Sequence, residues 1–284
     1  MKQFLGKLLV AVDGSHSCLR AKEMAASLAR KFGSKVTVVH VISHDFMHPE
    51  LKAHHQLPSL ILCELDKSFE EAGRKIIKNA EDFFREEKIE VETKLVRSED
   101  PANKILLMIE ESEYDLLVVG NISDSHDERY YLGNVAEKIS LYAKCPVLVA
   151  KRKTTINKLL VAVDGSKQAN KALEYAIQLC QHFGAKMTLI HVEQDELLKL
   201  EPQVIKQVGE EILAEAASKT KDVICDTRLE FGNPARTILR VTKQEDYDLI
   251  VLGSRGVSRV KRFLLGSVSS DVSMHAQRSV LIVR

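Results

Sequence analysis

The feature that most constrains the fold of this chain is an internal repeat. The sequence KLLVAVDGS at residues 7–15 returns without change at residues 158–166, which is 151 positions later. A repeat of this kind fixes the number of structural units independently of chain length. With 284 residues in total, each of two copies is long enough to bury a core of its own.

Later landmarks repeat at a shorter spacing. The sequence YDL at 114–116 returns at 247–249, 133 positions later, so the first copy contains 18 additional residues, which we place near 43–66. We therefore expect a first domain at residues 1–151 and a second at 152–284. The linker, residues 151–157, is so short that the two domains should be in close contact.

Within each copy, apolar runs alternate with helical patterns. The uninterrupted apolar runs at 8–12 and 159–163 are typical of strands buried on both faces of a parallel sheet. A helix at 68–86 is expected in the first copy, where apolar residues recur on one face. The alternation predicts an α/β fold: two tandem doubly wound parallel sheets, each of five strands in the order 3-2-1-4-5. The predicted strands are 8–12, 35–41, 91–96, 115–120 and 147–150 in the first copy, and 159–163, 186–192, 223–229, 248–253 and 280–283 in the second.

In sheets wound this way, ligands bind beyond the carboxyl ends of the strands, where the winding reverses. That point lies between the first and fourth strands, so Asp164 and Gly253 should face each other across a crevice. The loop after the fourth strand of the second copy has the spacing G-x2-G-x9-G-S at residues 253–267. We expect Gly253 and Gly256 to adopt positive φ and to let the backbone approach a ligand closely.

The same loop has features that suit an anionic ligand. Gly266 and Ser267 stand where a helix should begin, and the unpaired amides of a helix N-terminus bind phosphate. Arg255 adds positive charge, together with Arg259, Lys261 and Arg262. The alternative is that the glycines only shape a strand-to-helix connection and the basic residues form a solvated face.

Taken together, these motifs resemble the tandem type of the universal stress protein family over essentially the whole chain. The resemblance rests on the strand ending in Asp-Gly-Ser, the His-Val pair at 191–192, the YDLIVLG strand and the glycine loop. It implies a fold like that of the adenine nucleotide α-hydrolases and the ATP-binding branch of the family. The ligand would be ATP, ADP or AMP, with Mg²⁺ as a further candidate.

The resemblance also implies roles for single residues of the second copy. Asp164 would bond the ribose hydroxyls or a nucleotide-bound Mg²⁺, although an aspartate in this context is also suited to cap the following helix. Ala162 and the backbone of Val192 would flank the adenine. The residues expected around the phosphates are Gly253, Arg255, Gly256, Gly266, Ser267 and Val268.

The first copy departs from this pattern. Ser123 replaces the second glycine of the loop and Asn134 replaces its serine, while Asp124, Asp127 and Glu128 stand where the second copy has basic residues. Repulsion of a polyphosphate is the expected result. Asp13 and Gly120 remain, which leaves a nucleoside or a weaker ligand open.

Several histidines could suggest chemistry of another kind. His40 and His191 end equivalent strands, where we expect packed and hydrogen-bonded rings rather than catalysts. Four histidines of the insertion could hold Zn²⁺, but without a fixed ligand spacing a surface loop is the preferred interpretation. The apolar segment 57–65 is either a lid or partner-binding segment, or the start of the second helix. The four histidines of the insertion are His44, His48, His54 and His55.

We expect a stress-response protein whose second domain binds ATP and acts as a nucleotide-dependent sensor or regulator. No Walker motif or evident general base is present, so any ATPase activity should be weak. Alternatives are a slow ATPase or phosphotransferase using Ser267, and a protein-interaction module independent of nucleotide. The exposed fifth strands should pair, giving an internal pseudo-dimer or a homodimer.

Composition limits the partners and the location. A net charge of +1 gives no reason to expect nucleic acid, and no apolar run reaches the length of a membrane helix. The five cysteines form no C-x-x-C pair and suit free thiols in a reducing compartment, so we expect a cytoplasmic protein.

Overall fold

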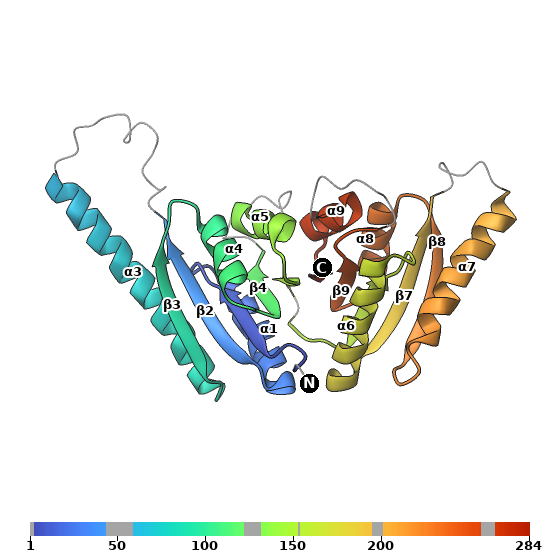
Figure 1. The fold of residues 1–284 in the computed structure, drawn as a ribbon, viewed down its shortest axis with the longest axis horizontal. Helices are drawn as coiled ribbons and strands as arrows, with labels where there is room; N and C mark the ends of the chain where they lie inside the picture. The colour runs from blue at the N-terminus through green and yellow to red at the C-terminus, as the bar shows by residue number, and fades with distance from the viewer. Residues whose placement is uncertain (1–2, 44–58, 122–131, 153, 195–200, 257–264) are drawn as a thin grey trace.

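A computed structural model describes residues 3–43, 59–121, 132–152, 154–194, 201–256 and 265–284. The two repeats lie side by side, with α3 and α7 at the outer ends and α5 and α9 meeting near the middle (Figure 1). No helix in these ranges combines the length and the hydrophobicity of a membrane span. The elements of the first repeat are β1 (Lys7–Ala11), α1 (His16–Phe32), β2 (Lys35–Ile42), α3 (Ser59–Glu86), β3 (Val91–Arg97), α4 (Pro101–Glu111), β4 (Leu116–Gly120), α5 (Asn134–Tyr142) and β5 (Val147–Ala150). Those of the second are β6 (Lys158–Ala162), α6 (Lys167–Phe183), β7 (Lys186–Glu193), α7 (Pro202–Ser218), β8 (Cys225–Phe231), α8 (Pro234–Gln244), β9 (Leu249–Gly253), α9 (Ser267–His275) and β10 (Ser279–Val283).

The strands of both repeats form one continuous sheet in the order β3-β2-β1-β4-β5-β10-β9-β6-β7-β8. Within each repeat the pairs are parallel and follow the predicted order 3-2-1-4-5, so the predicted fold class is confirmed. The two halves join through β5 and β10, which pair antiparallel with Leu148 opposite Leu281. The expected pairing of the fifth strands is therefore made inside a single chain.

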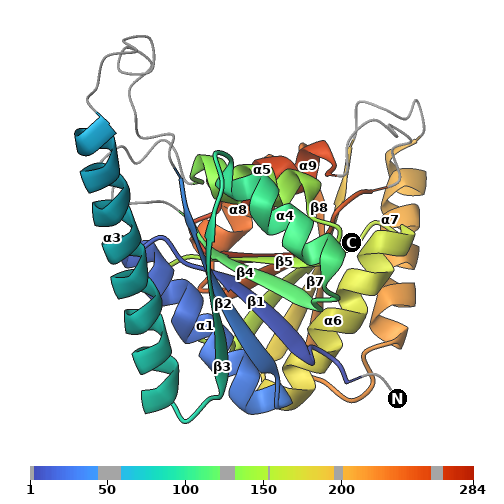
Figure 2. The ribbon, with the colours of Figure 1, turned by 60° about the vertical axis from the view of Figure 1, so that its left-hand side comes forward.

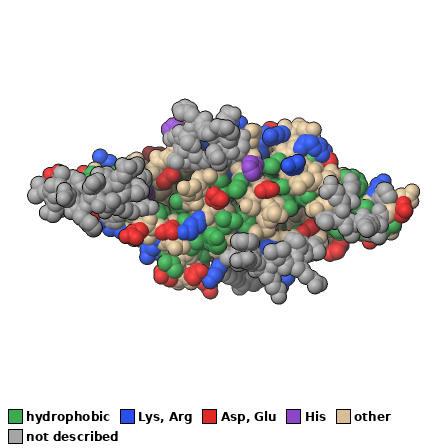
Figure 3. All heavy atoms as spheres, turned by 90° about the horizontal axis from the view of Figure 1, so that it is seen from above, with side chains coloured by type: hydrophobic (Ala, Val, Ile, Leu, Met, Phe, Trp, Pro, Cys, Tyr) green, Lys and Arg blue, Asp and Glu red, His purple; other side chains and the backbone are tan. Residues whose placement is uncertain are grey.

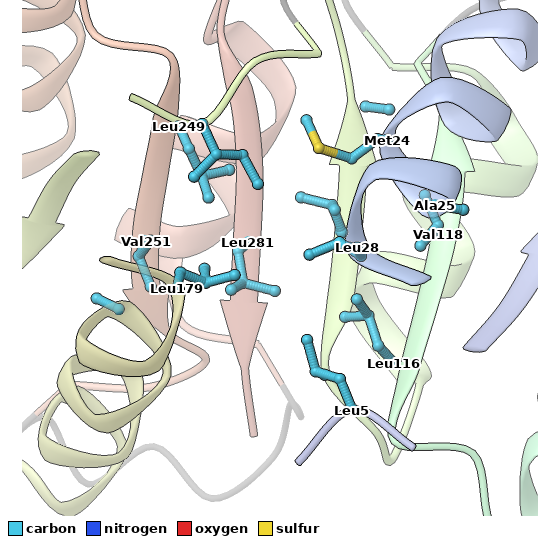
Figure 4. Close-up of a cluster of buried hydrophobic side chains, with 14 of the residues drawn as sticks. Leu5, Met24, Ala25, Leu28, Leu116, Val118, Leu179, Leu249, Val251 and Leu281 are labelled. Carbon is cyan, nitrogen blue, oxygen red and sulfur yellow. The ribbon is translucent and has the colours of Figure 1, made fainter. Parts of the chain in front are cut away.

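Alternate residues of each strand supply the cores on the two faces of the sheet. Leu8 and Val10 belong to the core that faces α1 and α3, whereas Leu9 belongs to the core under α4 and α5. Helices α1 and α4 lie on opposite faces of the sheet (Figure 2). The core under α1, α3, α6 and α7 continues across the join, where Leu28 of α1 and Leu281 of β10 face each other (Figure 4). Burial of this shared apolar surface stabilises the two repeats as one body.

Two basic side chains link the repeats reciprocally. Lys151, the residue after β5, donates hydrogen bonds from Nζ to the carbonyl oxygens of Ser273 (2.8 Å) and Ala276 (2.7 Å) at the end of α9. Arg284, the residue after β10, donates to the carbonyl oxygen of Ser140 in α5. Each repeat therefore caps the carboxyl end of the last helix of the other repeat, where the helix dipole favours a cation.

The second helix of the first repeat differs from its prediction. α3 begins at Ser59 rather than at residue 68, so part of the predicted insertion is helical. Of the two interpretations of segment 57–65, the helix start holds from Ser59 onward. The amphipathic pattern continues upstream through apolar residues that sequence alone left ambiguous. Residues 44–58, with the four insertion histidines, lie outside the described residues.

Candidate functional site

The carboxyl ends of β6, β7 and β9 come together with the start of α9. Asp164 follows β6, and Oδ2 of its side chain lies against Gly256: a Cβ added to that glycine would be 2.4 Å from the oxygen. The Ser166 hydroxyl donates a hydrogen bond to the carbonyl oxygen of Arg255 at 3.3 Å. The turn after β6 thus contacts the loop after β9, as the winding of the sheet predicts.

The predicted positive φ of the loop glycines is wrong. Neither Gly253 nor Gly256 has positive φ. The left-handed glycine near this site is Gly165 (φ 75°), and its counterpart in the first repeat is Gly14 (φ 82°). Gly253 is required for close approach instead. A Cβ there would lie 2.7 Å from the carbonyl carbon of Gln168 and 2.8 Å from the amide nitrogen of Ala169, both in the backbone of α6.

The Asp-Gly-Ser sequence has a defined local role. Oδ1 of Asp164 accepts a hydrogen bond from the backbone N–H of Ser166 at 3.0 Å, which stabilises the turn through the left-handed Gly165. Ser166, not Asp164, caps α6: its hydroxyl oxygen accepts from the N–H of Ala169 at 3.1 Å. The alternative role of Asp164 as the helix cap is therefore taken by Ser166.

The start of α9 has the properties of an anion site. Gly266 is its N-cap and, having no side chain, makes no cap hydrogen bond to the first turn. The Gly266 N–H donates to the carbonyl oxygen of Ser254 (2.7 Å), and the Ser269 hydroxyl donates to that of Gly253 (2.7 Å), which fixes the helix against the loop. The exposed Ser267 opens the first turn, whose amides carry the positive end of the helix dipole.

Apolar side chains lie beside this polar edge. Ala162 at the end of β6, Val192 in β7 and Val268 in α9 are partly buried and pack against the same hydrophobic core. All nine residues predicted for the site thus lie at the carboxyl ends of β6, β7 and β9 or at the start of α9. Arg259, Lys261 and Arg262 lie outside the described residues.

The described residues at the carboxyl ends of β6, β7 and β9 do not form a metal site by themselves. Among the described residues, no group of three or more His, Cys, Asp or Glu side chains is placed to hold an ion. Asp164 could at most share a cation with a ligand that brings its own oxygen atoms. Seen from above, acidic and basic side chains are interspersed over the described part of the surface (Figure 3).

A buried pair beside the site was missed by sequence reasoning. His191 is buried, and its Nδ1–H donates to the carbonyl oxygen of Val163 at 2.7 Å, which is the packed environment expected. Its Nε2 lies 3.0 Å from Oε1 of Glu193, also buried. The only signal for this pair in the sequence is a glutamate two positions further along the strand, which places both side chains on one face.

Comparison with known proteins agrees with this architecture. The model of the universal stress protein family matches residues 5–151 and again residues 155–284. The chain belongs to the universal stress protein family. The universal stress protein YxiE of Bacillus subtilis is 36% identical in an alignment of 146 residues. The alignment covers 45% of this chain and 99% of that protein.

A solved universal stress protein structure spans both repeats. The protein, from Archaeoglobus fulgidus, superposes with a TM-score of 0.74 over 99% of this chain and 98% of its own, at 22% sequence identity. At that identity the likeness shows the fold. This universal stress protein chain is therefore of the tandem type, with two copies of the family domain in one polypeptide.

The first repeat has an open cavity at the corresponding position. Its volume is about 800 Å³, and it lies where β1, β2 and β4 end. Asp13, Gly120 and Asn134 are among its lining residues, and they correspond to Asp164, Gly253 and Ser267. The sequence predicted that polyphosphate would be repelled here, but it did not indicate that a cavity of this size would persist.

Proposed function

We propose that the second repeat binds ATP or a related adenine nucleotide, and that the protein acts as a nucleotide-dependent regulator in a stress response. The observation that carries the proposal is the approach of Asp164 to Gly256 beside the uncapped first turn of α9. A carboxylate, a glycine without a Cβ and a row of helix amides supply different recognition chemistry within one small volume.

Each part of the nucleotide has a suitable partner. The first-turn amides of α9 and the backbone at Gly256 would hold phosphate oxygens, because both offer N–H donors without steric hindrance. The Asp164 carboxylate would accept hydrogen bonds from ribose hydroxyls. Ala162 and Val192 would contact the adenine, and Val268 with Arg255 would border the phosphates.

Magnesium would be held jointly rather than by the protein alone. Asp164 supplies one hard oxygen ligand, and nucleotide phosphates would supply others, which suits the preference of Mg²⁺ for a few protein ligands. When bound, the ion would neutralise phosphate charge next to the carboxylate. This lowers the repulsion between Asp164 and a triphosphate.

Regulation is favoured over rapid turnover. The described site offers the amides of a helix N-terminus and one carboxylate, but rapid phosphoryl transfer also needs an oriented nucleophile and cations on the transferred group. We therefore expect occupancy, rather than hydrolysis, to change the behaviour of the protein. The second candidate, slow ATP hydrolysis or transfer to the exposed Ser267, would be observed by ³¹P NMR of the mixture.

Calorimetric titration with ATP and Mg²⁺ tests the proposal. Gly256→Ala places a Cβ 2.4 Å from Oδ2 of Asp164, so the carboxylate must move and we expect ATP affinity to fall at least tenfold. Asp164→Asn should weaken binding to a similar extent. The matched control is Asp13→Asn, the same change in the first repeat, which should leave ATP affinity unchanged.

Two results would contradict the proposal. One is the lack of ATP binding by the wild-type protein at millimolar concentration. The other is equal loss of affinity from Asp13→Asn and Asp164→Asn, which would show that the two repeats do not differ as the glycine loop requires. Circular dichroism of each variant verifies that the fold is retained.

A further inference from the structure

The last helices of the two repeats, α5 and α9, meet at the join between the repeats (Figure 1). Leu141, near the end of α5, packs against the core of the second repeat, as does Val268 in the first turn of α9. Met274, near the end of α9, packs against the core of the first repeat, to which Ala136 in the first turn of α5 belongs. Each helix thus begins at the strand ends of its own repeat and ends against the core of the other. Packed side chains that connect two sites in this way carry energetic coupling between them.

Arg284 connects the loop after β9 with the end of α5. Val283 is the partner of Gly253 in the parallel pair of β10 and β9. The carbonyl oxygen of Val283 accepts a hydrogen bond from the N–H of Ser254, the next residue of the loop, at 2.7 Å. Arg284 follows Val283 directly, and its guanidinium donates to the carbonyl oxygen of Ser140 in α5. The residue that caps a helix of the first repeat is therefore one position away from a backbone contact to the proposed nucleotide loop.

A second positive charge acts on this connection. Arg255 follows Ser254 in the loop and is half-buried. Burial lowers the pKa of Arg284 from 12.5 to about 10, and the nearby charge of Arg255 lowers it further. Arg284 is still charged at neutral pH, so the two guanidinium groups repel each other across a partly desolvated space. A phosphate bound beside Arg255 would compensate its charge, and the Arg284 cap on α5 would then be stronger.

We propose that occupancy of the nucleotide site in the second repeat is transmitted to the first repeat, because it strengthens the Arg284 cap and so orders α5. The inference rests on the proposed nucleotide binding and adds the contact through which binding regulates the rest of the chain. Carbonyl groups at a helix end need partners, so a stronger cap at Ser140 reduces local opening of α5. Asn134 opens the same helix and lines the first-repeat cavity, which is therefore ordered with it. Because coupling between binding sites is reciprocal, anything that orders α5 should also raise nucleotide affinity.

Hydrogen–deuterium exchange of the full chain, with and without millimolar ATP and Mg²⁺, tests the proposal. A peptide covering residues 265–275 reports on the nucleotide site, and a peptide covering residues 134–143 reports on α5. We expect ATP to slow exchange in both, and in α5 by about fivefold, the lower end of the usual coupling between two sites. Protection of 265–275 alone would mean that the nucleotide binds but the transmission fails. Protection of neither peptide would mean that nucleotide binding itself fails.

Variants assign the effect to the two arginines. Arg284→Met removes the cap, so ATP should still protect 265–275 but no longer 134–143. Arg255→Met removes the repulsion without any ligand, so exchange in 134–143 should already be slow in the absence of ATP. This second measurement applies even if Arg284→Met does not fold, which circular dichroism shows. Asp164→Asn weakens nucleotide binding and should reduce protection of both peptides together. The matched control is Lys144→Met, which removes an exposed cation just after α5 that pairs with Glu110 and should leave the effect of ATP unchanged.

The possible outcomes separate the transmission from direct binding to the first repeat. Protection of 134–143 by ATP that is lost in Arg284→Met and kept in Lys144→Met supports the proposal. Protection of 134–143 that survives in Asp164→Asn, where 265–275 has lost it, would place ATP in the first repeat itself and overturn the proposal. Wild-type α5 that ATP does not protect overturns it as well, and so does unchanged exchange of α5 in ligand-free Arg255→Met.

Discussion

Raising the pH from 7 to 8.5 should stabilise the protein through one buried lysine. Lys151 is almost completely buried, and its Nζ donates to the carbonyl oxygens of Ser273 and Ala276 at the end of α9. Burial penalises the charged form and lowers the pKa of Lys151 from 10.5 to about 7. A neutral amine still has two N–H donors, so both carbonyl groups keep their partner when the proton leaves.

The sign of the effect follows from proton counting. In the unfolded chain Lys151 has its ordinary pKa of 10.5, so between the folded and unfolded pKa values the unfolded state holds more protons. The free energy of unfolding therefore rises with pH in this window. At lower pH the lysine is protonated in both states, so its contribution no longer changes with pH. At 1.36 kcal/mol for each pKa unit, the increase between pH 7 and 8.5 is about 1.6 kcal/mol.

Urea unfolding followed by circular dichroism at four pH values from 7 to 8.5 measures this increase. Lys151→Met removes the titrating group, so the stability of the wild-type protein relative to this variant should grow by about 1.6 kcal/mol over the range. The two carbonyl groups left unpaired in the variant lower its stability equally at each pH. Lys144→Met is the control, since Lys144 is exposed and pairs with Glu110 at 2.8 Å. Parallel curves for wild type and Lys151→Met would show that the buried lysine does not titrate in this window, and the reasoning would fail.

Two further predictions follow from buried contacts. Gly253→Ala should lower the free energy of unfolding by about 1 to 3 kcal/mol, because its Cβ would overlap the backbone of α6. The control Gly266→Ala, whose added Cβ would meet no atom closer than 3.5 Å, should cost less in the same urea experiment, about 0.5 kcal/mol for replacing a glycine N-cap by alanine. Burial raises the pKa of the Cys145 thiol to about 11, so its alkylation at pH 8, measured by peptide mass spectrometry, should be far slower in the folded protein than in urea. Equal rates in the two states would show that the thiol is accessible in the folded protein.

The repeat was sufficient to predict the architecture. The same succession of strand and helix patterns in both copies predicted the strand order of both halves, because right-handed crossovers leave few alternatives. The boundaries were less predictable where an apolar segment suits two structures. α3 begins at Ser59 rather than at residue 68, because the apolar segment before residue 68 suits both a helix and a loop and periodicity alone did not separate the two.

The sequence predicted where the loop glycines stand, but not why they are glycines. Gly253 ends β9 and Gly266 precedes α9 as their spacing predicted, yet a glycine is compatible with both positive φ and close approach. Only the structure separates these two reasons for a glycine: Gly253 lies against the backbone of α6, and Gly256 lies against Asp164. The burial of Lys151 could not be predicted from the sequence either, because it depends on how α9 of the second repeat packs against the residue that follows β5.

The two repeats differ in sequence at the carboxyl ends of their strands but keep the contacts that join them. The contacts that join the halves, β5 with β10 and the reciprocal caps of Lys151 and Arg284, are present in both repeats in equivalent form. A change in either cap would expose helix carbonyl groups inside a shared interface, so both caps are under structural constraint. Ser267 and its counterpart Asn134 each open the last helix of their repeat and do not belong to the core that the two repeats share. Duplication within one chain therefore lets these two positions differ while the contacts between the repeats keep their pseudo-twofold symmetry.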